Sequence, residues 1–90
     1  MQELIHEHST HVRTPEGERF IARTYGEPDD SGLWHGWLDF ESLTRPGVRL
    51  QTDRETTQPN RAALEYWAEG LEPLYFEGAF ERARVLVRNE

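Results

Sequence analysis

Three histidines lie close together near the start of the chain, in the segment HEHSTH at residues 6–11. If this segment is a strand, His6 and His8 share one face and their backbone positions lie about 6–7 Å apart. Two imidazoles at that spacing can bind one zinc ion, whereas His11 faces the other way unless a bulge intervenes. No second group of ligands follows, because His35 is the only other histidine. We therefore expect a polar edge strand without a metal, and His6 and His8 stay as weak metal candidates.

His35 and Asp39 are the two residues that come closest to an acid–base dyad. On one strand they share a face, but the stretch between them spans about 13 Å, so the side chains cannot hydrogen-bond directly. The hydroxyl groups that could act as nucleophiles belong to Ser31, Ser42, Thr56 and Thr57. None of these lies in a Gly-x-Ser-x-Gly elbow, and the chain has neither a Gly-x-Gly-x-x-Gly motif nor a P-loop. We therefore expect no enzymatic activity and no cofactor.

The composition excludes several further classes of protein. The chain of 90 residues has a formal net charge of −7, all its basic residues are arginine, and it contains no cysteine. Lysine Schiff-base chemistry and disulfides are therefore absent. The acidic balance argues against a nucleic-acid partner, because neutralisation of phosphates supplies most of that affinity. The sequence has no apolar run that could span a bilayer and no signal-peptide core, so we expect a cytoplasmic protein without membrane contact.

The periodicity of apolar residues predicts a single α+β domain over residues 1–90. Turn signals at residues 14–17, 27–32 and 44–47 separate segments in which apolar and polar residues alternate. The expected strands cover residues 19–25, 33–41 and 48–52. Residues 1–12 either add a further strand or fold over the sheet. The fold class is thus a three- or four-stranded antiparallel meander followed by two C-terminal helices packed on one face.

A helical period begins after residue 58, where Leu64, Trp67 and Leu71 recur at helical spacing. We expect a helix over residues 61–69, with Trp67 buried between this helix and the sheet.

The ends of the helices follow from capping residues. Thr57 or Gln58 is expected to be the N-cap, and Gly70 to end the helix in a Schellman-like stop. Pro73 either opens a second helix or kinks one long helix through residues 59–84. Residues 84–88 could form a short strand or fray.

Trp37 is the residue that says most about function. If Trp34 and Leu38 face the helices, Trp37 stands on the opposite face of the sheet beside His35. Aromatic and arginine side chains together are typical of protein interfaces, although they can also stack bases, and the chain termini could cover them instead. The expected interaction site consists of Trp37, His35, Arg23, Tyr25 and Arg49.

A homodimer is the expected form, since a domain this small without disulfides has few other ways to add stability. Arg23 and Arg49 would then reach Asp39 and Glu41 of the second copy. We therefore predict a non-catalytic protein-interaction or regulatory module that forms a homodimer. An unidentified protein is a possible further partner. The alternative is a small-ligand or metal-binding protein that uses His6, His8 and His11.

Two stretches of the sequence carry a resemblance. RETTQPNRAALEYWAEGLEPLYFEGAFERA, at residues 54–83, resembles the pattern of a family of small uncharacterised bacterial proteins, and the similarity extends to GLWHGWLDF at residues 32–40. No activity is established for that family, so the resemblance implies no catalytic residues. The order of the elements is also similar to antitoxin-type domains with a three-stranded sheet and a flanking helix, a likeness of topology alone.

Overall fold

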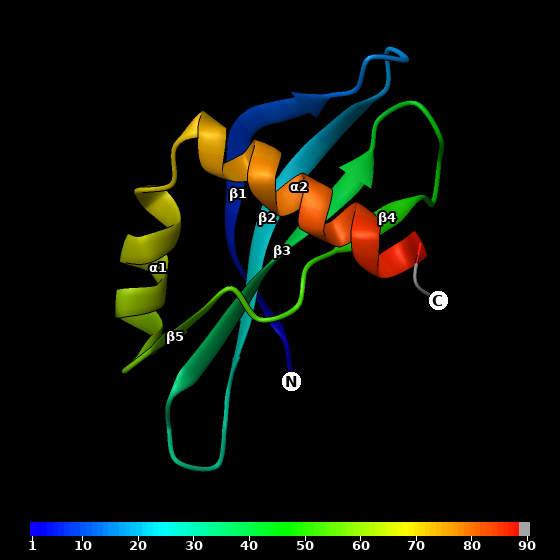
Figure 1. The fold of residues 1–90 in the computed structure, drawn as a ribbon. Coiled ribbons are helices and arrows are strands. Elements are labelled where there is room, and N and C mark those ends of the chain that lie inside the picture. Colours follow the sequence, from blue (N-terminus) through cyan, green and yellow to red (C-terminus); the bar gives the residue numbers. More distant parts are fainter. Residues whose placement is uncertain (89–90) are drawn as a thin grey trace.

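The computed structural model describes residues 1–88, which form a five-stranded sheet with two helices on one of its faces (Figure 1). The strands are β1 (Glu3–Arg13), β2 (Arg19–Pro28), β3 (Trp34–Ser42), β4 (Arg49–Gln51) and β5 (Thr56–Gln58), and the helices are α1 (Arg61–Glu69) and α2 (Pro73–Arg88). All pairings are antiparallel; the strands run in the order β1-β2-β3-β4, and β5 pairs with β3 farther along the same edge. The α+β meander with two C-terminal helices on one face, predicted from the sequence, is confirmed. The short strand β5 is an addition to it.

The register of the sheet fixes which residues face the helices. β2 and β3 pair without interruption from Phe20 opposite Ser42 to Pro28 opposite Trp34. Because side chains alternate along a strand, the even-numbered residues of both strands face the helices and the odd-numbered ones face away. We call the second side the open face, since no helix in residues 1–88 lies on it. Residues 3–13 form the edge strand β1, which settles the alternative between a strand and a cover over the sheet.

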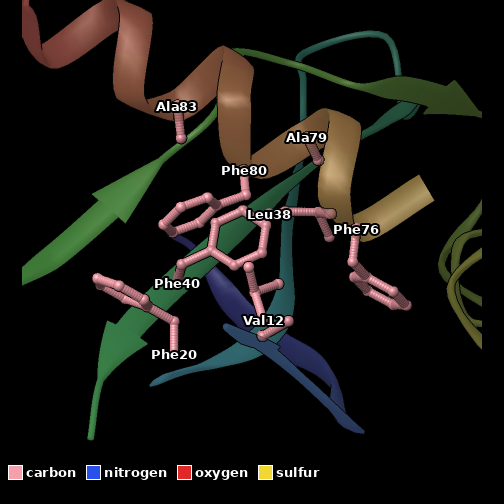
Figure 2. Close-up of a cluster of buried hydrophobic side chains, with 9 residues drawn as sticks. Val12, Phe20, Leu38, Phe40, Phe76, Ala79, Phe80 and Ala83 are labelled. Atoms are coloured by element: carbon pink, nitrogen blue, oxygen red, sulfur yellow. The ribbon is translucent and has the colours of Figure 1, made fainter. Parts of the chain in front are cut away.

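The main core lies between α2 and the sheet (Figure 2). Phe80 of α2 contacts Phe20 and Phe40, with ring centroids 4.8 and 5.3 Å apart. The other buried residues of this core are small or aliphatic, apart from one further phenylalanine: Val12, Ala22, Leu38, Phe76, Ala79 and Ala83. The buried residues of α2 thus combine two phenylalanines with two alanines.

A smaller core lies under α1 and depends on two glycines. Gly26 and Gly36 stand opposite each other on β2 and β3. Leu64, fully buried, packs onto both, and a Cβ atom added at Gly36 would lie 2.6 Å from Leu64 Cδ1. A Cβ at Gly26 would also meet Ile5 and the carbonyl oxygen of His35. Because these two glycines lack side chains, Leu64 of α1 can pack directly against the backbone of the sheet.

Both predicted caps of α1 differ from the structure. The N-cap is Asn60, whose side chain accepts a hydrogen bond of 2.8 Å from the Ala63 amide. Thr57 and Gln58 cannot cap the helix because they lie in β5, paired to β3. At the other end Gly70 has a φ of −88°, in the right-handed region, so the Schellman-like stop is wrong. The Gly70 amide instead closes onto the carbonyls of Tyr66 and Trp67.

The C-terminal third consists of two separate helices, with Pro73 as the first residue of α2. This position suits proline, because an amide there has no partner within the helix. Residues 84–88 continue α2, so the alternative of a short strand there is wrong. Trp67 was expected between helix and sheet, but Leu64 and Ala68 occupy that place and Trp67 is half-buried. No helix within residues 1–88 is long and apolar enough to cross a membrane.

Candidate functional site

The open face is built from rows of side chains that cross the sheet. One row is Leu4 of β1, Tyr25 of β2 and Trp37 of β3, which are direct cross-strand neighbours. Leu4 is 47% exposed, and both aromatic side chains are half-buried. Neighbours at this spacing contact each other across a sheet, so the three side chains form a continuous apolar stripe. We call it the aromatic row.

Two charged rows flank the aromatic row on one side. The first is Glu7, Arg23, Asp39 and Gln51, and the second is His11, Ile21, Glu41 and Arg49. Arg23 connects them, since it donates to Glu7 at 2.9 Å and to Glu41 at 2.6 Å. Only 19% of the Arg23 side chain is exposed. Hydrogen bonding from Arg23 lowers the pKa of Glu41, so this carboxylate stays ionised well into the acidic range.

Asp39 is fully buried although it belongs to the open face. Arg49 and Gln51 cover it, with Arg49 Nη2 at 3.0 Å and Gln51 Nε2 at 2.8 Å from Asp39 Oδ2. Arg49 also reaches the Tyr25 hydroxyl at 3.4 Å, which ties the charged rows to the aromatic row. A buried carboxylate needs such partners, because an ion without them is strongly destabilising in the folded state.

The charges on the open face balance each other. Its charged residues are Glu7, Glu27, Asp39 and Glu41, and Arg13, Arg19, Arg23 and Arg49. These are four acids and four arginines, so the whole net charge of −7 resides elsewhere on the chain. The pairs that were expected to join two copies, Arg23 and Arg49 with Glu41 and Asp39, are made within one chain.

His35 takes part in a chain of hydrogen bonds at the far end of the open face. Its Nε2 lies 2.8 Å from Asp29 Oδ2, and its Nδ1 lies 3.1 Å from Thr57 Oγ1 and 3.3 Å from Arg54 Nη1. Hydrogen bonds, first from Ser31 and then from His35, lower the pKa of Asp29 to about 2. An acid, an imidazole and a hydroxyl occur here in the order of a hydrolase triad.

The same geometry gives these groups a different role. Arg54 can only donate, so the Nδ1 of His35 accepts from it and is not free to take a proton from Thr57. The second carboxylate oxygen of Asp29 accepts the amides of Ser31 and Leu33 and thereby closes the turn between β2 and β3. We interpret these hydrogen bonds as a structural link between the β2–β3 loop and β5. We do not interpret Thr57 and His35 as a nucleophile and its base.

The histidines of β1 divide between the two faces of the sheet. His6 and His8 share the helix side, with ring centroids 4.7 Å apart, and His11 lies on the open face opposite Ile21. His8 was expected on a polar edge, but it is buried under α2, against the Phe76 ring at 4.6 Å. Its Nε2 shares a hydrogen bond of 2.7 Å with the Thr24 hydroxyl.

This use of His8 bears on the metal alternative. The Nε2 of His8 is engaged with the Thr24 hydroxyl, so this atom could bind a metal only by giving up that contact. Burial, with His6 adding to it, lowers the pKa of His8 to about 4, which keeps the imidazole neutral and does not itself oppose metal binding. Within the described residues no three histidine or acidic side chains come together in a way that could hold a metal ion.

Four of the five predicted site residues form one group, and the fifth stands at its end. Tyr25 and Trp37 are neighbours, Arg49 contacts Tyr25, and Arg23 lies two residues from Tyr25 on the same face of β2. His35 contacts β5 and the β2–β3 loop instead. Sequence reasoning missed Leu4, Glu7 and Gln51. Alternation within β4 indicated the face of Gln51, but Leu4 and Glu7 share the open face only because the register of β1 shifts between Leu4 and His6, which simple alternation does not predict.

Comparison of the chain with models of protein families, with characterised proteins and with solved structures finds no match in any of the three. The function proposed below therefore rests on the geometry of the open face.

Proposed function

We propose that the protein is a non-catalytic cytoplasmic interaction module, and that its contact surface is the open face, occupied by a second copy of the chain. The observation that carries the proposal is the combination of an aromatic row with balanced charges on a face without a helix. Aromatic side chains and arginine are the residues that contribute most to interface energies. Leu4, Tyr25 and Trp37 supply the apolar centre, and Arg23 and Arg49 border it.

Balanced charge favours a second copy over other occupants. In a two-fold contact a surface meets itself, so any excess of one charge would face the same excess across the axis. A chain with a net charge of −7 avoids this repulsion only where acids and arginines are already paired. The ion pairs of Arg23 with Glu7 and Glu41, and of Arg49 with Asp39, provide that pairing on the open face.

The aromatic row also provides a reason for association. Its members are incompletely buried in the single chain, and each becomes more buried when two rows meet near the axis. Apolar burial is worth about 25 cal/mol per Å² removed from water, so packing of aromatic groups supplies the main attraction. The paired charges at the border supply orientation more than affinity.

Light scattering of the full chain across micromolar concentrations tests the proposal. We expect a mass of twice 10.6 kDa. Trp37→Asp should return the mass to that of one chain, because it places a charge without a partner at the centre of the contact. The matched control is Tyr66→Asp, which puts the same charge on a side chain 82% exposed on the helix side, and it should leave the dimer intact.

Circular dichroism of both variants shows whether the fold persists, and Tyr25→Ser offers a second, uncharged disruption of the same row. A single-chain mass that persists as the wild-type protein is concentrated refutes the dimer. A dimer that survives both Trp37→Asp and Tyr25→Ser, in folded variants, refutes the open face as its contact surface.

A further inference from the structure

A second apolar surface lies on the helix side of the molecule, where α1 meets α2. Two shallow, largely open hollows of about 600 and 400 Å³ adjoin here and share Gly70, Leu71 and Tyr75 as common lining. Trp67 and Tyr75 both line the larger hollow, with ring planes at 89° and centroids 5.8 Å apart. We call this surface the inter-helix groove.

The side chains at the rim of the inter-helix groove are not required by the fold. Tyr66 lines the larger hollow and is 82% exposed, and Leu74 lines the smaller one and is 77% exposed. Neither belongs to the two buried clusters that hold the helices on the sheet. An exposed tyrosine beside a half-buried tryptophan matches the residue types that dominate binding energy at interfaces, and the exposed leucine enlarges this apolar surface.

The charged side chains near the inter-helix groove that lack an ion-pair partner are acidic. Glu69 and Glu72 are exposed at the connection between the helices, and neither has an ion-pair partner among the described side chains. The arginines nearest to this surface are committed elsewhere. Arg82 lies over the Tyr75 ring at 5.6 Å but is held by Glu55, and Arg61 pairs with Glu3 and Glu65. Glu72 lines the smaller hollow and Glu69 precedes Glu72 by three residues in the chain, so the charge without a partner beside this apolar surface is negative.

We propose that the inter-helix groove binds a basic peptide segment with two apolar anchors, one for each hollow. Two adjoining hollows with a common wall suit consecutive anchors of one extended or helical segment better than a single compact ligand. Arginine or lysine residues beside the anchors would meet Glu69 and Glu72. The open face, with its balanced charges, offers no such preference, so this site is independent of the proposed dimer contact.

The probe is a capped hexapeptide, Arg-Lys-Trp-Lys-Leu-Arg, and its control replaces each basic residue by glutamate. Amide and indole signals of the isotope-labelled protein are followed during titration with each peptide. We expect saturable shifts, largest at the Trp67 indole and at residues 66–75, with the basic peptide alone. Binding should weaken with added salt, because salt shortens the distance over which exposed charges attract each other, which is about 8 Å at physiological ionic strength.

Two variants assign the contact. Tyr66→Ala should weaken binding about tenfold, which corresponds to about 1.4 kcal/mol, typical of an interface aromatic. Glu69→Gln together with Glu72→Gln should weaken it severalfold and remove most of its salt dependence. Leu43→Ala is the matched control, since it truncates a side chain 47% exposed outside the groove and should bind as the wild type does.

The proposal fails if neither peptide gives saturable shifts up to millimolar concentration, or if both bind equally well. It also fails if the shifts map to the open face, or if Tyr66→Ala binds like Leu43→Ala. If the protein self-associates and Tyr66→Ala alone abolishes that association, the occupant is a second copy and the basic peptide is ruled out.

Discussion

His8 should make the stability of the protein fall as the solution becomes mildly acidic. The imidazole is 6% exposed, shares a hydrogen bond with Thr24 and contacts the Phe76 ring. Burial, with His6 adding to it, lowers the pKa of His8 from 6.5 to about 4. The unfolded chain therefore binds a proton in a range of pH where the folded chain does not, and the free energy of unfolding decreases as pH falls.

The magnitude follows from the two pKa values. Between pH 7.5 and pH 5 the unfolded His8 gains its proton almost fully while the folded one stays neutral, which removes about 2 kcal/mol of stability. The loss approaches about 3 kcal/mol at pH 4 and changes little below it. A domain of this size is stabilised by only about 5–13 kcal/mol, so the effect is a substantial part of the total.

Urea denaturation at pH 7.5, 6 and 5 measures this change. The informative variant combines His8→Leu with Thr24→Val, because removing His8 alone leaves the buried Thr24 hydroxyl without a partner, at a cost of about 1–3 kcal/mol. The double variant should lose most of the pH dependence in this window. His6→Gln is the control and should retain most of it. An unchanged slope in the double variant would refute the assignment to His8.

Two further predictions concern the packing of α1 against the sheet and the N-cap of this helix. Gly26→Ala should lower the free energy of unfolding by about 1–3 kcal/mol, because the added methyl group meets buried Leu64, Ile5 and the His35 carbonyl, and thermal denaturation would show a lower midpoint. A variant as stable as the wild type would mean that α1 shifts freely on the sheet. Asn60→Ala should cost about 1 kcal/mol in urea denaturation, since the Ala63 amide loses its cap. If Thr57→Ala costs more than Asn60→Ala, the helix begins differently.

The fold was predictable from the sequence to the extent that it depends on local periodicity. Alternation in residues 33–41 placed Leu38 and Phe40 on one face and Trp37 on the other, and the helical spacing of Leu64 and Ala68 gave the bounds of α1. The predicted N-cap was wrong because Thr57 pairs with a strand that is distant in the sequence. Its pairing with His35 is a contact that no local rule contains.

The candidate site was predictable in composition but not in its pairing. The sequence placed Arg23, Tyr25 and Trp37 on one face, yet the partners of Arg23 follow from registers that cross three strands. The burial of His8 depends on where α2 lies, which local periodicity in β1 cannot show. Contacts within an element follow from the sequence pattern, whereas contacts between elements need the topology.

The separation of charge gives the two proposed contacts different responses to salt. The open face carries four acids and four arginines, and Arg23 and Arg49 form ion pairs with three of those acids. Two copies that meet there have little net charge repulsion for salt to screen. The acidic pair Glu69 and Glu72 has no such balance among the described side chains, so its attraction for a basic segment falls with each increase in ionic strength. One chain with a net charge of −7 can then meet a copy of itself on one side and a cationic partner on the other. Excess acidic charge would oppose a dimer at the open face, whereas at the inter-helix groove it favours a basic peptide.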